Sequence, residues 1–343
     1  MDIDLSVGLA GLAVGFIVGL TGMGGGALMT PVLVLVFGVQ PLAAVSSDLV
    51  ASFVMKPVGG VVHWRRGTVN ANLVRWLVAG SVPAAFAGVL ILKGLGDGAT
   101  VQERMKTMLG VTLLVAATAM VARAMLQARR ARQHEPLPGS LDGSPLAVRR
   151  TATLAIGVIG GLIVGLTSVG SGSLIIVMLL LLYPSMRASE LVGTDLVQAV
   201  PLVGSAALGH LIFGDFSLDL TTSLLIGSLP GVYLGARVSS RANDAVVRPV
   251  LVFVLLASSL KLLGVGTVAL GVVMLAGVLV SLPVWGVLDA MARPKEQWDA
   301  AGHGKRRWVV SQAVTAPLGI GSTVALFYLC SVRAKLSAAG ANA

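Results

Sequence analysis

Charged residues are scarce in this chain of 343 residues. They make up 12% of it, against 55% hydrophobic residues, and the mean hydropathy is +0.90. No Asp, Glu, Lys or Arg occurs in residues 5–47 or in residues 151–186, although about 20 apolar residues suffice to cross a bilayer. This shortage excludes an ordinary soluble protein and predicts a chain that crosses a membrane several times.

Residues that form disulfides or hold metals are also few. The one cysteine, Cys330, excludes an intramolecular disulfide. The sequence has no H-E-x-x-H pair, no G-x-S-x-G motif and no cluster of metal ligands. We therefore expect no enzyme, no cofactor and no bound metal. The opening residues "MDIDLS" lack the basic region of a cleaved signal peptide, so we expect the first apolar segment to be retained.

The apolar segments are continuous rather than alternating, which favours helices over strands. Besides the uncharged stretches 5–47 and 151–186, they lie at about 48–63, 73–92, 107–122, 194–213, 219–236, 246–263, 267–288 and 309–330. We predict an all-α polytopic membrane protein. The formal net charge of +10 resides mostly in short loops between these runs, a pattern typical of membrane orientation and not of nucleic-acid binding.

The chain contains an internal repeat. "GLTGMGGGALMTP" at residues 19–31 matches "GLTSVGSGSL" at residues 165–174, and "SDLV" at 47–50 matches "TDLV" at 194–197. His63 then matches His210, and "GSVPA" at 80–84 matches "GSLPG" at 227–231. We divide the chain into a first transmembrane repeat (1–130), a basic cytoplasmic linker (131–150), a second transmembrane repeat (151–264) and a two-helix C-terminal appendage (265–343).

Whether the two repeats run parallel or inverted depends on the glycine-rich segments. A re-entrant hairpin there leaves three crossings in each half and inverts the repeats, whereas one broken span makes them parallel. The hairpin topology places 18 Lys and Arg residues in cytoplasmic loops and five outside, but the other topology divides them almost evenly. Cytoplasmic loops carry the excess of positive charge. We therefore predict inverted repeats, each with a re-entrant or broken Gly-rich hairpin and three transmembrane helices.

Two hairpin tips at membrane depth are typical of secondary transporters, since non-helical backbone is tolerated there only inside protein or beside a polar cavity. Free amides at the start of the second half-helix favour an anion. The alternative is that these glycines only permit close helix packing. "GMGGGA" also fits a dinucleotide fingerprint, but the preceding strand and following long helix are missing.

The motifs together resemble the sulfite exporter TauE/SafE family of the toluene-sulfonate uptake permease group. They are "GMGGGALMTPVL", "QPLAAVSSDLV", "GGVVHWRRGTV" and "LVAGSVPAAFAG", with "VGTDLVQAV", "GHLIFGDF" and "GSLPGVYLGA" in the second half. The resemblance spans residues 5 to about 264. It implies a duplicated, multi-pass protein of the bacterial plasma (inner) membrane that moves sulfite or organosulfonates. The two C-terminal helices and the serines of the second tip depart from the usual pattern.

Four polar residues share one face of the second apolar run: Asp48, Ser52, Lys56 and His63. A polar stripe of this kind points to the interior of a helix bundle. Asp48 and its copy in the second repeat, Asp195, each directly follow a hydroxyl residue. A place at the cap or in the first turn of a helix is therefore an alternative role for both acids. Lys56 lies in the middle of this apolar run, beside Pro57. Burial of a cation at that depth costs free energy, which suggests a function for Lys56. The alternative is that Lys56 only pairs with an acid. His63 and His210 fit either a structural role at a helix end or a role in proton coupling.

We expect a secondary transporter that exports or imports a small sulfur-containing anion, with export favoured. The alternatives are a channel-like anion facilitator, or a permease for another small organic anion. Expected partners are the anionic substrate and the lipid bilayer, with a homo-oligomer left open. The candidate substrate-binding residues are Thr21, Gly24, Gly25, Gly26, Ser47, Lys56, Thr167, Gly170, Ser171 and Thr194. The candidate ion-coupling residues are Asp48, Asp195, His63 and His210.

Overall fold

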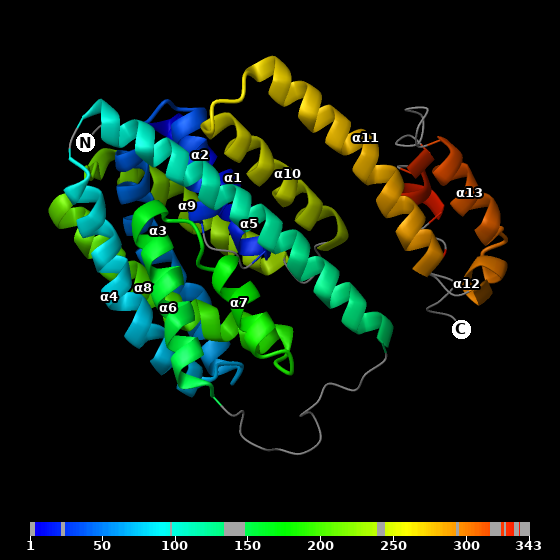
Figure 1. Ribbon diagram of the computed structural model, residues 1–343, viewed down its shortest axis with the longest axis horizontal. Coiled ribbons are helices and arrows are strands. Elements are labelled where there is room, and N and C mark those ends of the chain that lie inside the picture. Colours follow the sequence, from blue (N-terminus) through cyan, green and yellow to red (C-terminus); the bar gives the residue numbers. More distant parts are fainter. Residues whose placement is uncertain are drawn as a thin grey trace. The chain divides into compact units, whose positions relative to one another are not determined.

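The computed structural model describes residues 4–21, 25–96, 98–133, 148–238, 244–292, 295–315, 324–325, 327–332 and 336. Regular structure in these residues is helical, and the one β-bridge joins Gly170 to Gly172 within a loop. The all-α class is thereby confirmed. The helices are α1 (Leu5–Thr21), α2 (Gly26–Leu35), α3 (Pro41–Arg65), α4 (Ala71–Gly94), α5 (Ala99–Gln133), α6 (Arg150–Thr167), α7 (Leu174–Leu182), α8 (Ala188–Phe213), α9 (Leu218–Val238), α10 (Asp244–Leu262), α11 (Thr267–Ala292), α12 (Lys295–Ala300) and α13 (Lys305–Thr315), followed by a π-helical segment, Tyr328–Val332 (Figure 1).

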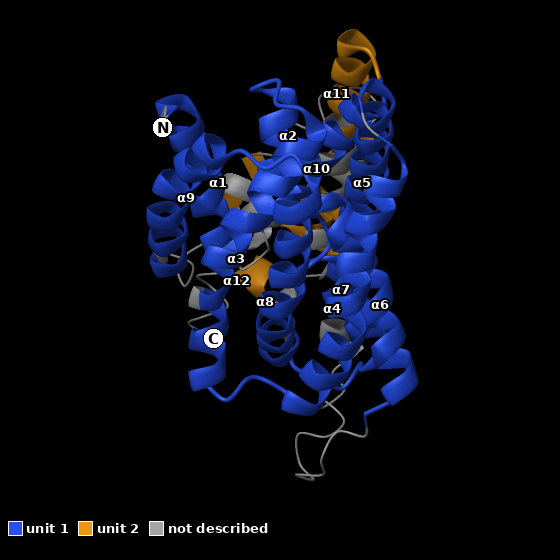
Figure 2. Ribbon diagram, turned by 90° about the vertical axis from the view of Figure 1, so that its left-hand side faces the viewer, with its two compact units in different colours: residues 1–264 blue, residues 265–343 orange. Residues whose placement is uncertain are grey.

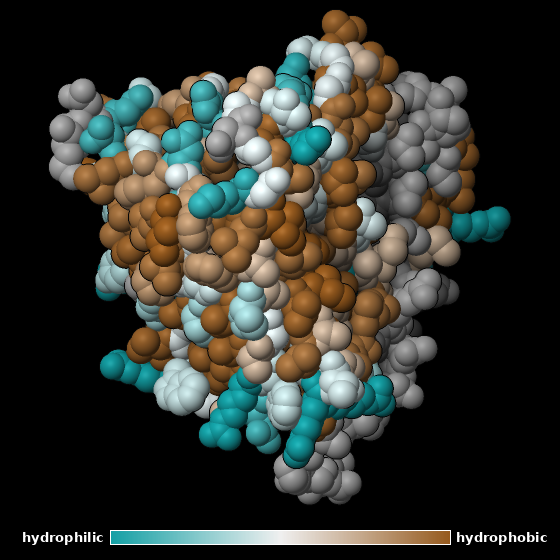
Figure 3. Space-filling model, turned by 60° about the vertical axis from the view of Figure 1, so that its left-hand side comes forward, coloured by the Kyte–Doolittle hydropathy of each residue, from teal (hydrophilic) through white to brown (hydrophobic). Residues whose placement is uncertain are grey.

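Five of these helices are long and apolar enough to cross a membrane: α3, α4, α6, Ala99–Leu126 of α5 and Ser189–Phe213 of α8. On the face seen in Figure 3, apolar side chains cover the middle, and hydrophilic ones gather toward the lower and upper edges. Such a surface suits a hydrocarbon core bounded by two polar interfaces. The chain is therefore a multi-pass membrane protein.

The chain forms two compact units, Met1–Gly264 and Val265–Ala343 (Figure 2). In the second unit α11 packs against α13, and the buried rings of Trp298 and Tyr328 stack with centroids 5.9 Å apart. The expected last apolar run, 309–330, contains the end of α13 and part of the π-helical segment; its residues 316–323 lie outside the described part.

Within the first unit α1 packs along α9 through a glycine face. A β-carbon at Gly11 would lie 2.9 Å from the carbonyl oxygen of Leu224, and one at Gly15 would lie 2.6 Å from that of Ser228. Both residue numbers rise together, so the two helices run parallel. Small residues let membrane helices approach to backbone contact, which replaces the hydrophobic drive that lipid does not supply.

The same arrangement joins α4 and α6. A β-carbon at Gly80 would lie 3.0 Å from the backbone nitrogen of Val158, and one at Gly88 would lie 3.3 Å from that of Leu166. These helices are also parallel. Because the sequence repeat equates α1 with α6 and α4 with α9, each half contributes its first helix to a contact with the other half.

Helices α3 and α8 form a third pair, which runs antiparallel. Ser46, near the start of α3, is hydrogen-bonded through Oγ to Nδ1 of His210, near the end of α8, at 2.8 Å. At the other ends, a β-carbon at Gly193 would lie 3.1 Å from Nδ1 of His63. The pair forms the centre of the first unit and carries Lys56 and both repeat-related acids.

Candidate functional site

The two glycine-rich segments do interrupt helices. The first lies between α1, which ends at Thr21, and α2, which begins at Gly26; residues 22–24, including the candidate Gly24, lie outside the described part. The second lies between α6 and α7, where Gly170 and Gly172 adopt positive φ angles of 129° and 94°. Glycine adopts such angles without a steric penalty, which explains its recurrence here.

These two tips meet at the centre of the first unit. A β-carbon at Gly26 would overlap the backbone carbonyl of Ser168, a residue with φ of 60° at the start of the second tip. A β-carbon at Gly25 would lie 3.5 Å from Ser52 Oγ, which belongs to the middle of α3. The described residues of the tips therefore lie about halfway along a helix long enough to span the membrane.

Asp48 joins both tips. Its Oδ2 accepts hydrogen bonds from Thr30 Oγ1 of α2 at 2.9 Å and from Ser168 Oγ of the second tip at 2.7 Å. The residue has no exposed surface. Ser52 lies beside the carboxylate, but neither Asp48 Oδ1 nor Ser52 Oγ makes a hydrogen bond of normal geometry within the described residues. Two donors thus hold one carboxylate oxygen, whereas the other makes no hydrogen bond of normal geometry in the described residues.

Lys56 is the one lysine found buried in the described residues, with 8% of its surface exposed. Its Nζ donates a hydrogen bond to Ser171 Oγ of the second tip. It interacts electrostatically with Asp195 and, more weakly, with Asp48. The ion pairs identified within 4.0 Å in the described part involve other residues, so neither carboxylate directly contacts the Lys56 ammonium.

Asp195, the copy of Asp48, has a different set of partners, which includes a second cation. Its Oδ1 accepts a hydrogen bond from Gln198 Nε2 at 3.0 Å, and the backbone of Gly172 bonds to the carboxylate as well. Arg123 of α5 and Lys56 both attract it through their charge. The two acids are equivalent in the sequence repeat but not in their surroundings.

The alternative of helix caps for the two acids is wrong. Helix α3 begins at Pro41 and α8 at Ala188, so Asp48 and Asp195 lie in the third turn of their helices. Backbone amides that need a cap belong to the first turn. Burial and contacts with the tips, rather than capping, account for both acids.

The histidines lie away from this cluster, at opposite ends of the α3 and α8 pair. His210 is buried, and besides its contact with Ser46 its Nε2 donates to the carbonyl oxygen of Gly165 at 2.9 Å. His63 is partly exposed and its Nδ1 contacts Thr68 Oγ1 at 2.9 Å. The repeat partner of Ser46 is Gly193, which has no side chain to offer His63. The two ends of the pair are therefore held together differently.

Four candidate hydroxyls do not point to Lys56. Thr21 and Thr167 donate to carbonyl oxygens of their own helices, at 2.9 and 2.7 Å. The other two, Ser47 and Thr194, contact the backbone of the loops before α9 and α4. Ser47 Oγ donates to the carbonyl of Ser217 at 3.5 Å, and Thr194 Oγ1 accepts from the amide of Asn70 at 3.1 Å.

The structure adds residues that the sequence reasoning missed: Thr30, Ser168, Gln198 and Arg123. Ser168 directly follows the repeated "GLT" motif, so inclusion of the whole tip would have found it. Gln198 lies one turn after Asp195 on the same helix face. Thr30 and Arg123 carry no local signal, because their role depends on which helices come together.

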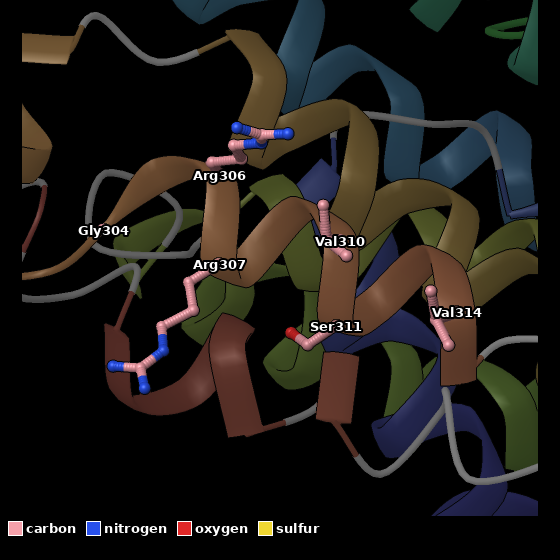
Figure 4. A pocket seen from close by; sticks show the side chains of 6 residues that line it. All are labelled: Gly304, Arg306, Arg307, Val310, Ser311 and Val314. Atoms are coloured by element: carbon pink, nitrogen blue, oxygen red, sulfur yellow. The ribbon is translucent and has the colours of Figure 1, made fainter.

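Open cavities lie elsewhere. One of about 650 Å³ in the second unit is lined by Gly304, Arg306, Arg307, Val310, Ser311 and Val314 (Figure 4). Another, of about 490 Å³, is lined by Asn72, Arg75, Trp76, Ala79, Val148 and Arg150 at the starts of α4 and α6. Neither cavity combines buried charges with non-helical backbone, as the described residues of the tips do. Across the described ranges no group of histidine, cysteine and acidic side chains is arranged to hold a metal ion.

Broken helices that meet between two interlocked halves, around buried charges, define a membrane transporter. Residues 7–262 match the sulfite exporter TauE/SafE family, and the chain belongs to that family. It is 40% identical over 261 residues to the probable membrane transporter protein YjnA of Bacillus subtilis (strain 168), covering 76% of this chain and all of that protein. It is 23% identical to the probable membrane transporter protein YdhB of the same organism, over 68% of this chain and 89% of that protein. No solved structure matches it.

Proposed function

We propose that this protein is a secondary transporter that moves a small sulfur-containing anion, such as sulfite or an organosulfonate, across the bacterial plasma membrane, with export as the net direction. The observation that carries the proposal is Lys56, a buried cation halfway along α3 that contacts the second tip. An ammonium at this depth is costly unless it has a use. The family to which the chain belongs supports sulfite as the class of substrate.

We place the anion between Lys56 and the two tips. The Lys56 ammonium supplies the charge, and the hydroxyl of Ser171 and the backbone at Gly25, Gly26 and Gly170 surround it. Ser173 Oγ is buried and lacks a hydrogen-bond partner among the described residues, so a further donor is open to a ligand. Amides at a half-helix start add partial positive charge without a second cation.

The proposed topology is a pair of inverted repeats. Its support is the antiparallel packing of α3 against α8 and the parallel packing of α1 with α9 and of α4 with α6. If each glycine-rich segment instead interrupted one helix that crosses the whole membrane, the repeats would be parallel. Helices α3 and α8 would then cross the membrane in the same direction. The count of basic residues in the loops agrees with the inverted arrangement.

Transport assays in proteoliposomes test the function. Labelled sulfite, thiosulfate and an organosulfonate are offered to vesicles with and without the protein. We expect flux of at least one of them above the protein-free background, and flux that responds to an imposed ion gradient. Flux that ignores proton and sodium gradients would identify a channel-like facilitator. Movement of a sugar or a cation, with no anion flux, would rule out the anion assignment.

Labelling of single cysteines tests the topology. In a Cys330→Ser background, cysteine replaces Ser140 in the linker or Asp215 in the loop between α8 and α9. We expect an impermeant thiol reagent added to intact cells to label position 215 and to leave position 140 unlabelled until the cells are opened, because the linker is proposed to be cytoplasmic. Labelling of position 140 from outside, or protection of position 215, would disprove the inverted arrangement.

A further inference from the structure

We propose that Asp48 takes up a proton when the anion binds, so that proton and anion cross the membrane together and the protein is a proton and anion symporter. This inference rests on the proposed function and deepens it, because it names the coupled ion and the residue that holds it. It starts from the difference between two acids that the sequence repeat makes equivalent.

When both acids are ionised, the charges around the site balance before any substrate arrives. Asp48 and Asp195 are then negative, and Lys56 and Arg123, the cations that act on them, are positive. The neighbouring elements add hydroxyls from α2 and the second tip. Apart from the exposed Tyr233 of α9, the other charged or titratable side chains described on α3, α5, α8 and α9 lie near helix ends. These are His63, Arg65, Glu103, Arg104, Lys106, Arg187, Glu190, His210, Asp219 and Arg237. A monovalent anion added to a neutral, buried cluster leaves one unbalanced negative charge, which a low-dielectric site strongly disfavours.

One proton on a carboxylate removes that imbalance, and Asp48 is the acid that can accept it. Its Oδ2 already holds two donors, from Thr30 and Ser168, and these bonds persist if the proton binds to the other oxygen. Oδ1 is buried and makes no hydrogen bond of normal geometry in the described part. The Ser52 hydroxyl lies beside the carboxylate and interacts with it, so a protonated Oδ1 has an acceptor within reach after a small adjustment.

Asp195 is suited to stay ionised. Its carboxylate accepts hydrogen bonds from Gln198 and from the backbone of Gly172, and both Arg123 and Lys56 attract it. Hydrogen bonds and cations directed at a carboxylate favour its charged form. The repeat thus supplies two acids, of which one balances the fixed cations and the other exchanges a proton.

Gly25 lies beside the proposed proton site. A β-carbon there would lie 3.7 Å from Asp48 Oδ1, 3.5 Å from Ser52 Oγ and 3.5 Å from Met55 Cε. A side chain larger than a methyl group would press against these atoms.

The direction of symport is set by the sum of the proton gradient and the anion gradient across the membrane. Net export therefore requires that the anion accumulate in the cytoplasm.

The test is calorimetric titration of the purified full chain with methanesulfonate and thiosulfate, anions that do not themselves titrate near neutral pH. Buffers of different ionisation enthalpy give the number of protons taken up. We expect about one proton per methanesulfonate bound when Asp48 starts ionised, and an affinity that weakens up to tenfold per unit rise in pH, because binding and protonation are linked. Binding of both anions with no proton uptake would overturn the inference.

The variant Asp48→Asn imitates the protonated acid. We expect it to bind methanesulfonate with no proton uptake and with an affinity independent of pH. Asp195→Asn should change the affinity yet keep the proton uptake, and Asp215→Asn, at an exposed acid, is the matched control that should behave as wild type. Undiminished proton uptake by Asp48→Asn would overturn the assignment to this residue.

Two further outcomes separate this inference from the proposed function. Binding that requires sodium, with no proton uptake, would mean that Asp48 and Ser52 hold a metal cation, which overturns the proton and keeps the anion. If wild-type protein binds none of methanesulfonate, thiosulfate and sulfite, the proposed function fails and the inference fails with it. Since wild-type protein supplies these measurements, they hold even if Asp48→Asn does not fold.

Discussion

Replacement of Lys56 by alanine is expected to weaken anion binding by roughly 100-fold, because removal of one partner from a buried charge contact costs on the order of 2–5 kcal/mol. The substitution removes the one buried lysine described at the tips and leaves Ser171 and two carboxylates facing the anion. Anion affinity is measured on folded, monodisperse protein by titration with thiosulfate.

Two further substitutions of Lys56 separate charge from shape. Lys56→Arg keeps the positive charge on a larger, planar group and should recover part of the affinity if the group fits, whereas Lys56→Gln should not. Lys106→Ala is the matched control, because that lysine is exposed and pairs with Glu103 on the surface. Unchanged affinity in folded Lys56→Ala protein would remove Lys56 from the site and direct attention to Ser171 and Ser173.

A methyl group at the contact between the tips is expected to have the second large effect. In Gly26→Ala the new β-carbon meets the backbone carbonyl of Ser168, which cannot swing aside as a flexible side chain can. The tips must separate, at a cost of about 1–3 kcal/mol or more, and Ser168 then moves away from Asp48. We expect a lower melting temperature and the loss of most anion flux.

The neighbouring residue provides the control for this prediction. In Gly25→Ala the added β-carbon has ordinary contacts of 3.5 Å or more with Ser52 and Met55, so the melting temperature should change little. A Gly26→Ala protein with the wild-type melting temperature and flux would contradict the contact between the tips.

Much of the fold could be predicted from the sequence, because lipid imposes simple rules on it. Long uncharged runs gave the helices, and the repeated glycine clusters gave the two breaks. The site was predicted less well, since it forms only when helices from both halves meet. Lys56 stands out at its depth in an apolar run, but Thr30 is one hydroxyl among many, and nothing near Arg123 indicates that it faces Asp195. The hydroxyls Ser47 and Thr194 follow the motif and yet contact loops.

The parallel pairing of α1 with α9 has a consequence for synthesis in the cell. Helix α1 emerges from the ribosome before α9, which begins at Leu218, roughly 200 residues later. At about 5–20 residues per second this delay lasts roughly 10–40 s. During that time the glycine face of α1 has lipid beside it instead of a neighbouring backbone. The first half therefore waits in the membrane, inserted but incompletely packed, until the second half arrives.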